Sequence, residues 1–417
     1  MKLLLVCCFL FCIFPRSLHS QQTDYGYKFL GKSVQPSIDS LKKAPLNSEN
    51  LIKLGDLYYS IENYNQAQKF YDHALKLDST DLHRYKVAKI SERQKKYQKA
   101  LDLYFVLWNK DTLNTVLQYR ISKLQMRLGR YQKAFKNLKS LKVKNPDHPI
   151  YPYQMGLIQT LEYEYSKSID YFLESFEKDS LFIDVIFQLA NSFNKLNIQD
   201  STTLFLNKGL KLDPVHQNLN RIKINRLKKE EKYHEAIGRL LQQDSLYPNE
   251  FYNTKMLGLC YFKIGAYEEA KTWFKESFQN NREDFNSLTY LGHIALQEGK
   301  IENALTNYFN ALNVAKTPRD EEYIGLGNVY QEMGKPKQAM DMFEKAYNEN
   351  GNNDAAFFEW ALASDRYYKD KKNGYNRYKH YLRRFAYKND SIKLAFIKSR
   401  MGAIKEKFFL EGIELEN

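Results

Sequence analysis

The side chains that could catalyse a reaction or bind a metal are scattered along this 417-residue sequence. The eight histidines form no H-E-x-x-H pair and no Cys/His pattern with metal-site spacing. No G-x-S-x-G turn or glycine-rich phosphate loop follows a predicted strand, because no strand is predicted. Carboxylate pairs at 230–231, 268–269 and 321–322 are expected on exposed helix or turn positions. We therefore expect no catalytic residue, no cofactor and no metal.

Stacking and ion pairing are instead the chemistry of a series of side chains that recurs every 34 residues. The series is Tyr85, Tyr119, Tyr153, Phe187, Arg221, Lys255 and Thr289. Aromatic rings bury a large area at low entropic cost, and tyrosine hydroxyls also form hydrogen bonds. The four rings predict a ladder on which a partner binds, followed by two cations. The alternative is that each ring packs sideways between neighbouring helices.

Further cations and amides accompany this series. One helical turn beyond members of the series come Lys89, Lys123, Asn191 and Asn225, while Lys86 and Arg120 directly follow the first two rings. Ammonium and guanidinium groups hold carboxylates through charge-assisted hydrogen bonds. These residues predict a binding surface that is basic toward the N-terminus and suits an acidic or aromatic partner.

Helices at a fixed period must position these side chains, because small residues recur at spacings of 33 to 35. They are Ala67, Ala100, Ala134, Ser168, Thr202, Ala236, Ala270, Ala304 and Ala339. Twelve residues before each lies another residue, small except for Ile224, and four residues after each lies a bulky one. Antiparallel helices approach closely where side chains are small, and the bulky residue fills the adjoining gap. The pattern predicts nine helical hairpins and a degenerate tenth.

This pattern resembles the tetratricopeptide repeat family. The resemblance is clearest in Leu54-Gly55-Tyr58-Ala67-Tyr71-Ala74 and Leu257-Gly258-Tyr261-Ala270-Phe274, and helix-ending prolines stand in the matching place at Pro146, Pro214 and Pro248. The resemblance implies an all-α fold, a right-handed α-solenoid of about ten hairpins with a C-terminal capping helix. It also implies that the first helix of each hairpin lines a concave groove, which would contain the 34-residue series.

Some members of that family hold a peptide carboxylate with a clamp of basic and asparagine side chains. Arg221 and Asn225 match two positions of the clamp, whereas Met256 and Asn286 stand where it would need Asn and Lys. The resemblance therefore implies that an acidic or aromatic segment is anchored there without a full clamp.

The first residues have the pattern of a secretory signal peptide, because Lys2 precedes an apolar run from Leu3 to Phe14. Three of the four cysteines lie within it, and lipidation of the N-terminus is left open. Only Cys260 would remain after cleavage, so the exported chain would have no internal disulfide. The apolar run is too short for a membrane span, and none is expected in the mature chain.

Four segments are expected along the chain: a signal peptide at 1–20, an N-terminal leader at 21–47, the repeat array at 48–388, and a capping helix with a tail at 389–417. The cap is predicted from an apolar stripe formed by Leu394, Ile397, Met401, Ile404 and Phe408. Departures from the pattern at Gly209, Ile224 and Gln243 predict looser packing or a bend in repeats five and six.

The formal net charge of +14 would suit a nucleic-acid partner in a cytosolic protein, but the cations are spread over most repeats and mixed with acids. Export also argues against nucleic acid. The predicted function is a non-enzymatic protein–protein interaction scaffold in the bacterial cell envelope, periplasmic or in an outer-membrane-associated complex. The alternative is a receptor-like binder of short peptides or glycans on the aromatic ladder.

Overall fold

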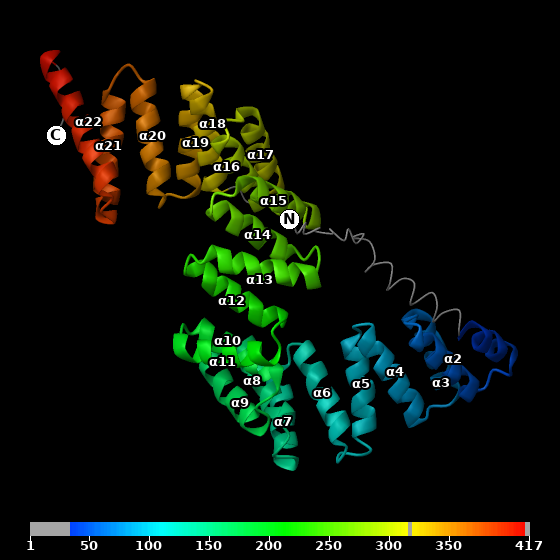
Figure 1. Ribbon diagram of the computed structural model, residues 1–417. Helices are drawn as coiled ribbons and strands as arrows, with labels where there is room; N and C mark the ends of the chain where they lie inside the picture. Colours follow the sequence, from blue (N-terminus) through cyan, green and yellow to red (C-terminus); the bar gives the residue numbers. More distant parts are fainter. Residues whose placement is uncertain (1–33, 316–318, 413–417) are drawn as a thin grey trace, which may run out of the picture. The chain divides into compact units, whose positions relative to one another are not determined.

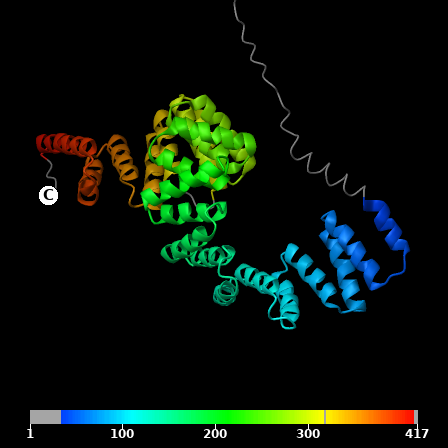
Figure 2. The same cartoon turned by 60° about the horizontal axis from the view of Figure 1, so that its bottom comes forward.

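The computed structural model describes residues 34–315 and 319–412, and every secondary-structure element within these ranges is a helix. The predicted signal peptide, residues 21–33 of the leader and the last residues of the tail lie outside the described residues. The chain divides into two compact units, residues 1–212 and 213–417. Successive helices stack side by side within each unit (Figures 1 and 2). The expected all-α array of helical hairpins is confirmed.

Within its described residues, the first unit contains a short helix and five hairpins. Its helices are residues 34–43, α2 (Ser48–Ser60), α3 (Tyr64–Leu77), α4 (Asp81–Arg93), α5 (Tyr97–Trp108), α6 (Thr115–Arg127), α7 (Tyr131–Lys144), α8 (Ile150–Leu161), α9 (Tyr165–Lys178), α10 (Ile183–Lys195) and α11 (Gln199–Leu212). In the short helix Ile38 is fully buried, so part of the predicted leader packs onto the array.

The second unit contains five further hairpins and the predicted cap. Its helices are α12 (Gln217–Lys229), α13 (Tyr233–Leu246), α14 (Phe251–Lys263), α15 (Tyr267–Asn280), α16 (Phe285–Gln297), α17 (Ile301–Val314), α18 (Asp320–Glu332), α19 (Pro336–Glu349), α20 (Asp354–Tyr367), α21 (Lys372–Phe385), the 3-10 turn η1 (Ala386–Lys388) and α22 (Ser391–Leu410).

Local sequence sets the ends of these helices. The side chains of Asn47 and Asn114 accept a backbone N–H in the first turn of α2 and α6, which satisfies a donor that has no partner inside the helix. Gly129 has a φ of 70° in the turn between α6 and α7, a conformation that glycine adopts without strain. Pro146 and Pro214 follow the last residues of α7 and α11 by two positions, as the sequence predicted.

In five hairpins the core contains an aromatic ring of the second helix seated on a glycine of the first. A β-carbon built on Gly156 would lie 2.5 Å from Phe172 Cε1, and one on Gly258 would lie 2.6 Å from Phe274 Cδ1. Real carbon atoms do not approach so closely, so only glycine fits beneath the ring. In these five hairpins the predicted pairing of a small with a bulky residue is therefore confirmed as ring-on-glycine packing.

The C-terminal helix α22 packs on the last hairpin through the predicted stripe. Ile397, Ile404 and Phe408 are buried in one cluster with Phe357 of α20 and Tyr378 of α21. The side chain of Asp390 accepts the backbone N–H of Lys393 and begins the helix. The predicted capping helix is confirmed.

The two weak repeats lie on either side of the division between the units. Ile224 is fully buried in α12, and the Gln243 side chain, also buried, donates a hydrogen bond to the Val215 carbonyl at 3.1 Å. The larger side chain and the amide are thus accommodated inside the sixth hairpin. The expected bend or looser packing stays a prediction.

One expectation, that the pair Glu321 and Glu322 lies on an exposed face, is wrong. Glu322 is fully buried at the start of α18, where it accepts hydrogen bonds from Arg319 at 2.9 Å and from Thr289 at 2.7 Å. Glu321 is half-buried and pairs with His293 at 3.3 Å. A buried carboxylate is tolerated because a cation and a hydroxyl face it.

Candidate binding site on the first helices

The aromatic members of the 34-residue series occupy corresponding positions on the first helices of four successive hairpins, α4, α6, α8 and α10. All four side chains are half-buried. Tyr85 meets Tyr104 of its own hairpin with ring centroids 5.9 Å apart. Tyr119 meets Tyr151 of the next hairpin at 6.1 Å. Tyr153 meets both Phe172 of its own hairpin at 6.1 Å and Phe182 of the next at 5.0 Å. The rings thus support the packing and leave part of their surface open.

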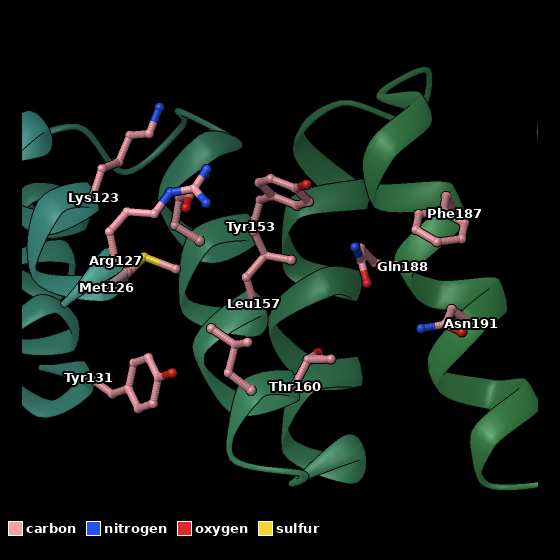
Figure 3. Close-up of a pocket in the computed structure, with 12 residues that line it drawn as sticks. Lys123, Met126, Arg127, Tyr131, Tyr153, Leu157, Thr160, Phe187, Gln188 and Asn191 are labelled. Carbon is pink, nitrogen blue, oxygen red and sulfur yellow. The ribbon is translucent and has the colours of Figure 1, made fainter. Parts of the chain in front are cut away.

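An open cavity of about 730 Å³, named here the aromatic hollow, lies across α6, α8 and α10. Tyr153 and Leu157 lie in the middle, and Phe187 and Asn191 stand on the α10 side (Figure 3). It is lined by Lys123, Met126, Arg127, Tyr131, Tyr153, Gln154, Leu157, Thr160, Leu161, Phe187, Gln188 and Asn191. The mixture of apolar side chains with a few amides and cations is typical of a binding site.

A second cavity of about 440 Å³, named here the cationic hollow, lies between α4 and α6. It is lined by Lys89, Glu92, Arg93, Lys95, Tyr97, Arg120, Lys123, Leu124 and Arg127. Lys123 and Arg127 line both hollows and are exposed, so the two cavities share a cationic edge. Such a concentration of cations around one carboxylate attracts negatively charged groups.

The predicted cations of the first unit differ in how far internal contacts engage them. Lys86 forms an ion pair with Asp56 at 2.5 Å, and Arg120 forms a longer one with Glu92 at 3.4 Å. Lys89 and Lys123 lie over tyrosine rings, with Nζ 4.8 Å and 5.8 Å from the centroids. Ammonium groups over rings keep their capacity for hydrogen bonds, so Lys89 and Lys123 remain available to a carboxylate.

The same series is used differently in the second unit, where each member donates to an acid near the start of the next first helix. Arg221 pairs with Glu250 at 2.6 Å and Lys255 pairs with Asp284 at 2.6 Å. Thr289 donates to the buried Glu322. These side chains connect neighbouring hairpins.

The two matched positions of the carboxylate clamp are also occupied by internal contacts. The Arg221 guanidinium lies over the Tyr252 ring at 4.9 Å, and the Tyr252 hydroxyl donates to Asn225 Oδ1 at 3.1 Å. A peptide carboxylate would have to displace Glu250 from Arg221. The first unit is therefore the better candidate for binding.

Burial changes the acidity of the tyrosines in the first unit. It raises the pKa of Tyr153 to about 12, with a smaller contribution from Asp184, and it also raises the pKa of Tyr119. Both hydroxyls therefore stay protonated at neutral pH and can donate a hydrogen bond.

The sequence did not predict most residues of the aromatic hollow, among them Met126, Arg127, Tyr131 and Gln188. Arg127 lies four residues after Lys123, one turn further along the same helix face, so helical spacing could have found it. Tyr131 starts the second helix α7, and the period of the first helices gives no indication of its place in the hollow.

Four segments match the sequence profile of the tetratricopeptide repeat, residues 48–81, 117–148, 256–284 and 323–353. Each overlaps one hairpin of the structure, α2–α3, α6–α7, α14–α15 and α18–α19. The chain therefore carries tetratricopeptide repeats, as its sequence predicted.

Among solved structures, yeast Tom70 covers 87% of this chain and 96% of its own at 12% identity and a TM-score of 0.42. PilW, a type IV pilus biogenesis factor, covers 51% of this chain and 97% of its own at 12% identity and a TM-score of 0.44. Pseudomonas aeruginosa PilF covers 51% and 95% at 18% identity, also with a TM-score of 0.44. No curated protein sequence matches the chain. The matched profiles are those of a repeat that generally mediates protein–protein interactions and is typically non-catalytic.

Within the described ranges, no helix has the length and apolar character needed to cross a membrane. No group of three or more His, Cys, Asp or Glu side chains in those ranges could hold a metal ion.

Proposed function

We propose that this protein is a non-enzymatic scaffold that binds an extended segment of a partner protein across the first helices α6, α8 and α10. The observation that carries the proposal is the aromatic hollow bordered by Lys123 and Arg127. An open groove with apolar walls and a few polar groups fits a peptide better than a reaction, because catalysis needs a site that excludes water.

The side chains of the hollow indicate the chemistry of the segment. Tyr153, Leu157 and Phe187 offer an apolar surface to an aliphatic or aromatic anchor. Lys123 and Arg127 suit carboxylates on the side toward the cationic hollow. Gln188 and Asn191 can exchange hydrogen bonds with an extended backbone. The proposed ligand is thus an acidic segment with at least one large apolar residue.

The proposal places this scaffold in the bacterial cell envelope, as an exported protein in the periplasm or in a complex at the outer membrane. The leading segment, Lys2 followed by an apolar run to Phe14, supports export. Fractionation of cells that produce the full chain should recover it from the envelope without residues 1–20. Recovery of the uncleaved chain from the cytosol would contradict this part of the proposal.

Identification of the partner is the decisive experiment. The chain should be cross-linked in envelope fractions and co-purified partners identified by mass spectrometry. A synthetic peptide from the cross-linked segment should bind the purified chain. The double variant Tyr153→Ala/Phe187→Ala should weaken binding at least about tenfold.

The charge-reversal pair Lys123→Glu/Arg127→Glu should weaken binding of the same peptide and reduce its salt dependence. Matched controls are Phe309→Ala for the rings and Lys263→Glu/Lys275→Glu for the charges, because all three residues are exposed in the second unit. Equal loss in the controls, or a ligand that proves to be a glycan, would overturn the proposal of an acidic peptide segment.

A further inference from the structure

The helix α22 has two apolar faces. One packs on the last hairpin, and the other is open. Ile392, Phe409 and Leu410 expose 81%, 83% and 78% of their surface. At the edge of this face Phe396 exposes 41%, and its ring also packs against Phe358 of α20 and Tyr378 of α21, with centroids 5.8 Å and 6.4 Å apart. Exposed apolar side chains that gather on one face mark an interaction surface.

Helical geometry places these residues together, opposite the buried stripe. At about 100° per residue, Ile392, Ala403 and Leu410 lie within about 20° of one direction around the helix axis. The open face consists of Ser391, Ile392, Ala395, Phe396, Ser399, Gly402, Ala403, Glu406, Phe409 and Leu410, all of them exposed. It carries a single charge, Glu406. The last helix of a repeat array normally presents a polar outer face, so this face is unusual.

Cations border the open face on both sides. Lys398 and Lys405 follow one edge, and Lys407 lies on the other. All three are exposed, and within the described residues neither Lys398 nor Lys405 has a carboxylate within 4.0 Å. Of the other cations of α22, Lys393 pairs with Asp354 and Arg400 pairs with Asp365 of α20, and Lys407 lies 3.7 Å from Glu411. Lys398 and Lys405 therefore carry most of the positive charge that is available to a ligand.

We propose that α22 lies on an anionic lipid membrane, with its open face in the headgroup region. The bordering lysines can extend their ammonium groups to lipid phosphates while their carbon chains stay beside the apolar face. The rings and aliphatic side chains enter the boundary between headgroups and acyl chains, and positive charge draws the helix to anionic lipid. The inference is independent of the proposed peptide site in the first unit.

The borders argue against a second copy of the chain as the occupant. In an antiparallel pair of α22 helices, the edge with Lys398 and Lys405 would face the same edge of the other copy, and in a parallel pair it would face the edge with Lys407. Like charges along both edges would repel.

The placement of the large side chains argues against a protein helix. Ile392 and Phe396 lie near one end of α22, and Phe409 and Leu410 lie at the other, with Ser399, Gly402 and Ala403 exposed between them. A protein partner would need separate pockets for anchors about 20 Å apart, at about 1.5 Å per residue. A fluid lipid layer accepts them without pockets.

The test is flotation of the purified chain with vesicles. Vesicles of phosphatidylcholine with about 30% phosphatidylglycerol should bind it at least about tenfold more strongly than pure phosphatidylcholine. Raising sodium chloride from about 50 to about 500 mM should weaken binding to the anionic vesicles. Phe409→Ser/Leu410→Ser and Lys398→Glu/Lys405→Glu should each reduce the bound fraction at least about fivefold.

Matched controls place the same changes elsewhere on exposed helix positions: Val143→Ser/Leu204→Ser for the apolar pair and Lys263→Glu/Lys275→Glu for the charged pair. Both controls should float like the parent, and circular dichroism should show unchanged helix content in every variant. The proposal is overturned by equal binding to the two vesicle types. It is also overturned by loss of binding in the controls, or by a dimer in solution that the α22 variants abolish.

Discussion

The two units place the same periodic position on their first helices and use it in opposite ways. In the first unit Tyr119, Tyr153 and Phe187 are half-buried rings, two of which line the aromatic hollow. In the second, Arg221 and Lys255 reach across to acids of the next hairpin at 2.6 Å each. The period fixes where a side chain projects, and the neighbouring hairpin decides whether it remains available for a ligand.

The largest expected effect comes from removing a cation that neutralises a buried acid in the second unit. Arg319→Met should lower the free energy of unfolding by about 2–3 kcal/mol, because Glu322 is left buried without its cation. Urea unfolding followed by the reactivity of Cys260, which is buried in the same unit, should report the loss. Arg282→Met, at an exposed site, is the control. Equal stability of the two variants would show that these ion pairs do not hold the second unit together.

Ring-on-glycine packing should cost the same in both units, since it is common to them. Gly156→Ala and Gly258→Ala should each destabilise by about 1–3 kcal/mol, because the new β-carbon meets Phe172 or Phe274. Gly238→Ala is the control, since a β-carbon there meets nothing within 4 Å, and it should stabilise by about 0.5–1 kcal/mol. Thermal unfolding by circular dichroism measures all three. A large effect in only one unit would mean that the units differ in their cores.

Two lysines, one from each unit, allow the two uses of a cation to be compared directly. Lys255→Met should destabilise by about 1–2 kcal/mol, because Asp284 is 1% exposed and loses its cation while keeping hydrogen bonds from two serines. Lys123→Met should change stability by less than about 0.5 kcal/mol, because this lysine is exposed. Urea unfolding compares the two variants directly. If Lys123→Met were the more harmful change, the first unit's cations would be structural as well.

The smallest effect on stability is expected when the pH is lowered, at the contact between Asp354 and the C-terminal cap. Burial raises the pKa of Asp354, but hydrogen bonds from Lys388 and Lys393 outweigh it and lower the pKa to about 2. A carboxylate with a depressed folded-state pKa stabilises above its unfolded pKa, so this contribution is lost as pH falls from about 4 to about 2. The protection factors of the α22 amides against hydrogen exchange should therefore fall over that range. In Asp354→Asn they should no longer depend on pH in this way. Asp170→Asn, an exposed site in the first unit, should leave it unchanged.

Much of the fold could be predicted from the sequence, because the 34-residue period is repeated many times and the main contacts join residues of the same hairpin. The same sixteen-residue spacing predicts the same contact in different repeats, as for Gly55 with Tyr71 and for Gly258 with Phe274. Whether a side chain of the 34-residue series is free to bind a partner could not be predicted from this spacing. The spacing of Arg221 does not indicate that Glu250 lies opposite it. That acid comes from the next hairpin and is not a member of the 34-residue series. The predicted groove therefore stays a prediction in both units, with stronger support in the first.

The seating of each ring on its glycine also bears on how such a chain could change its length. In five such contacts both partners belong to one hairpin, sixteen positions apart, as in Gly156 and Phe172, and one further contact joins Tyr308 to Gly325 of the next hairpin. A gene that gained or lost a segment of 34 codons would keep the contacts within each hairpin intact, whereas a shorter deletion would separate rings from their glycines. The architecture thus tolerates duplication or loss of whole hairpins but not of parts of a hairpin.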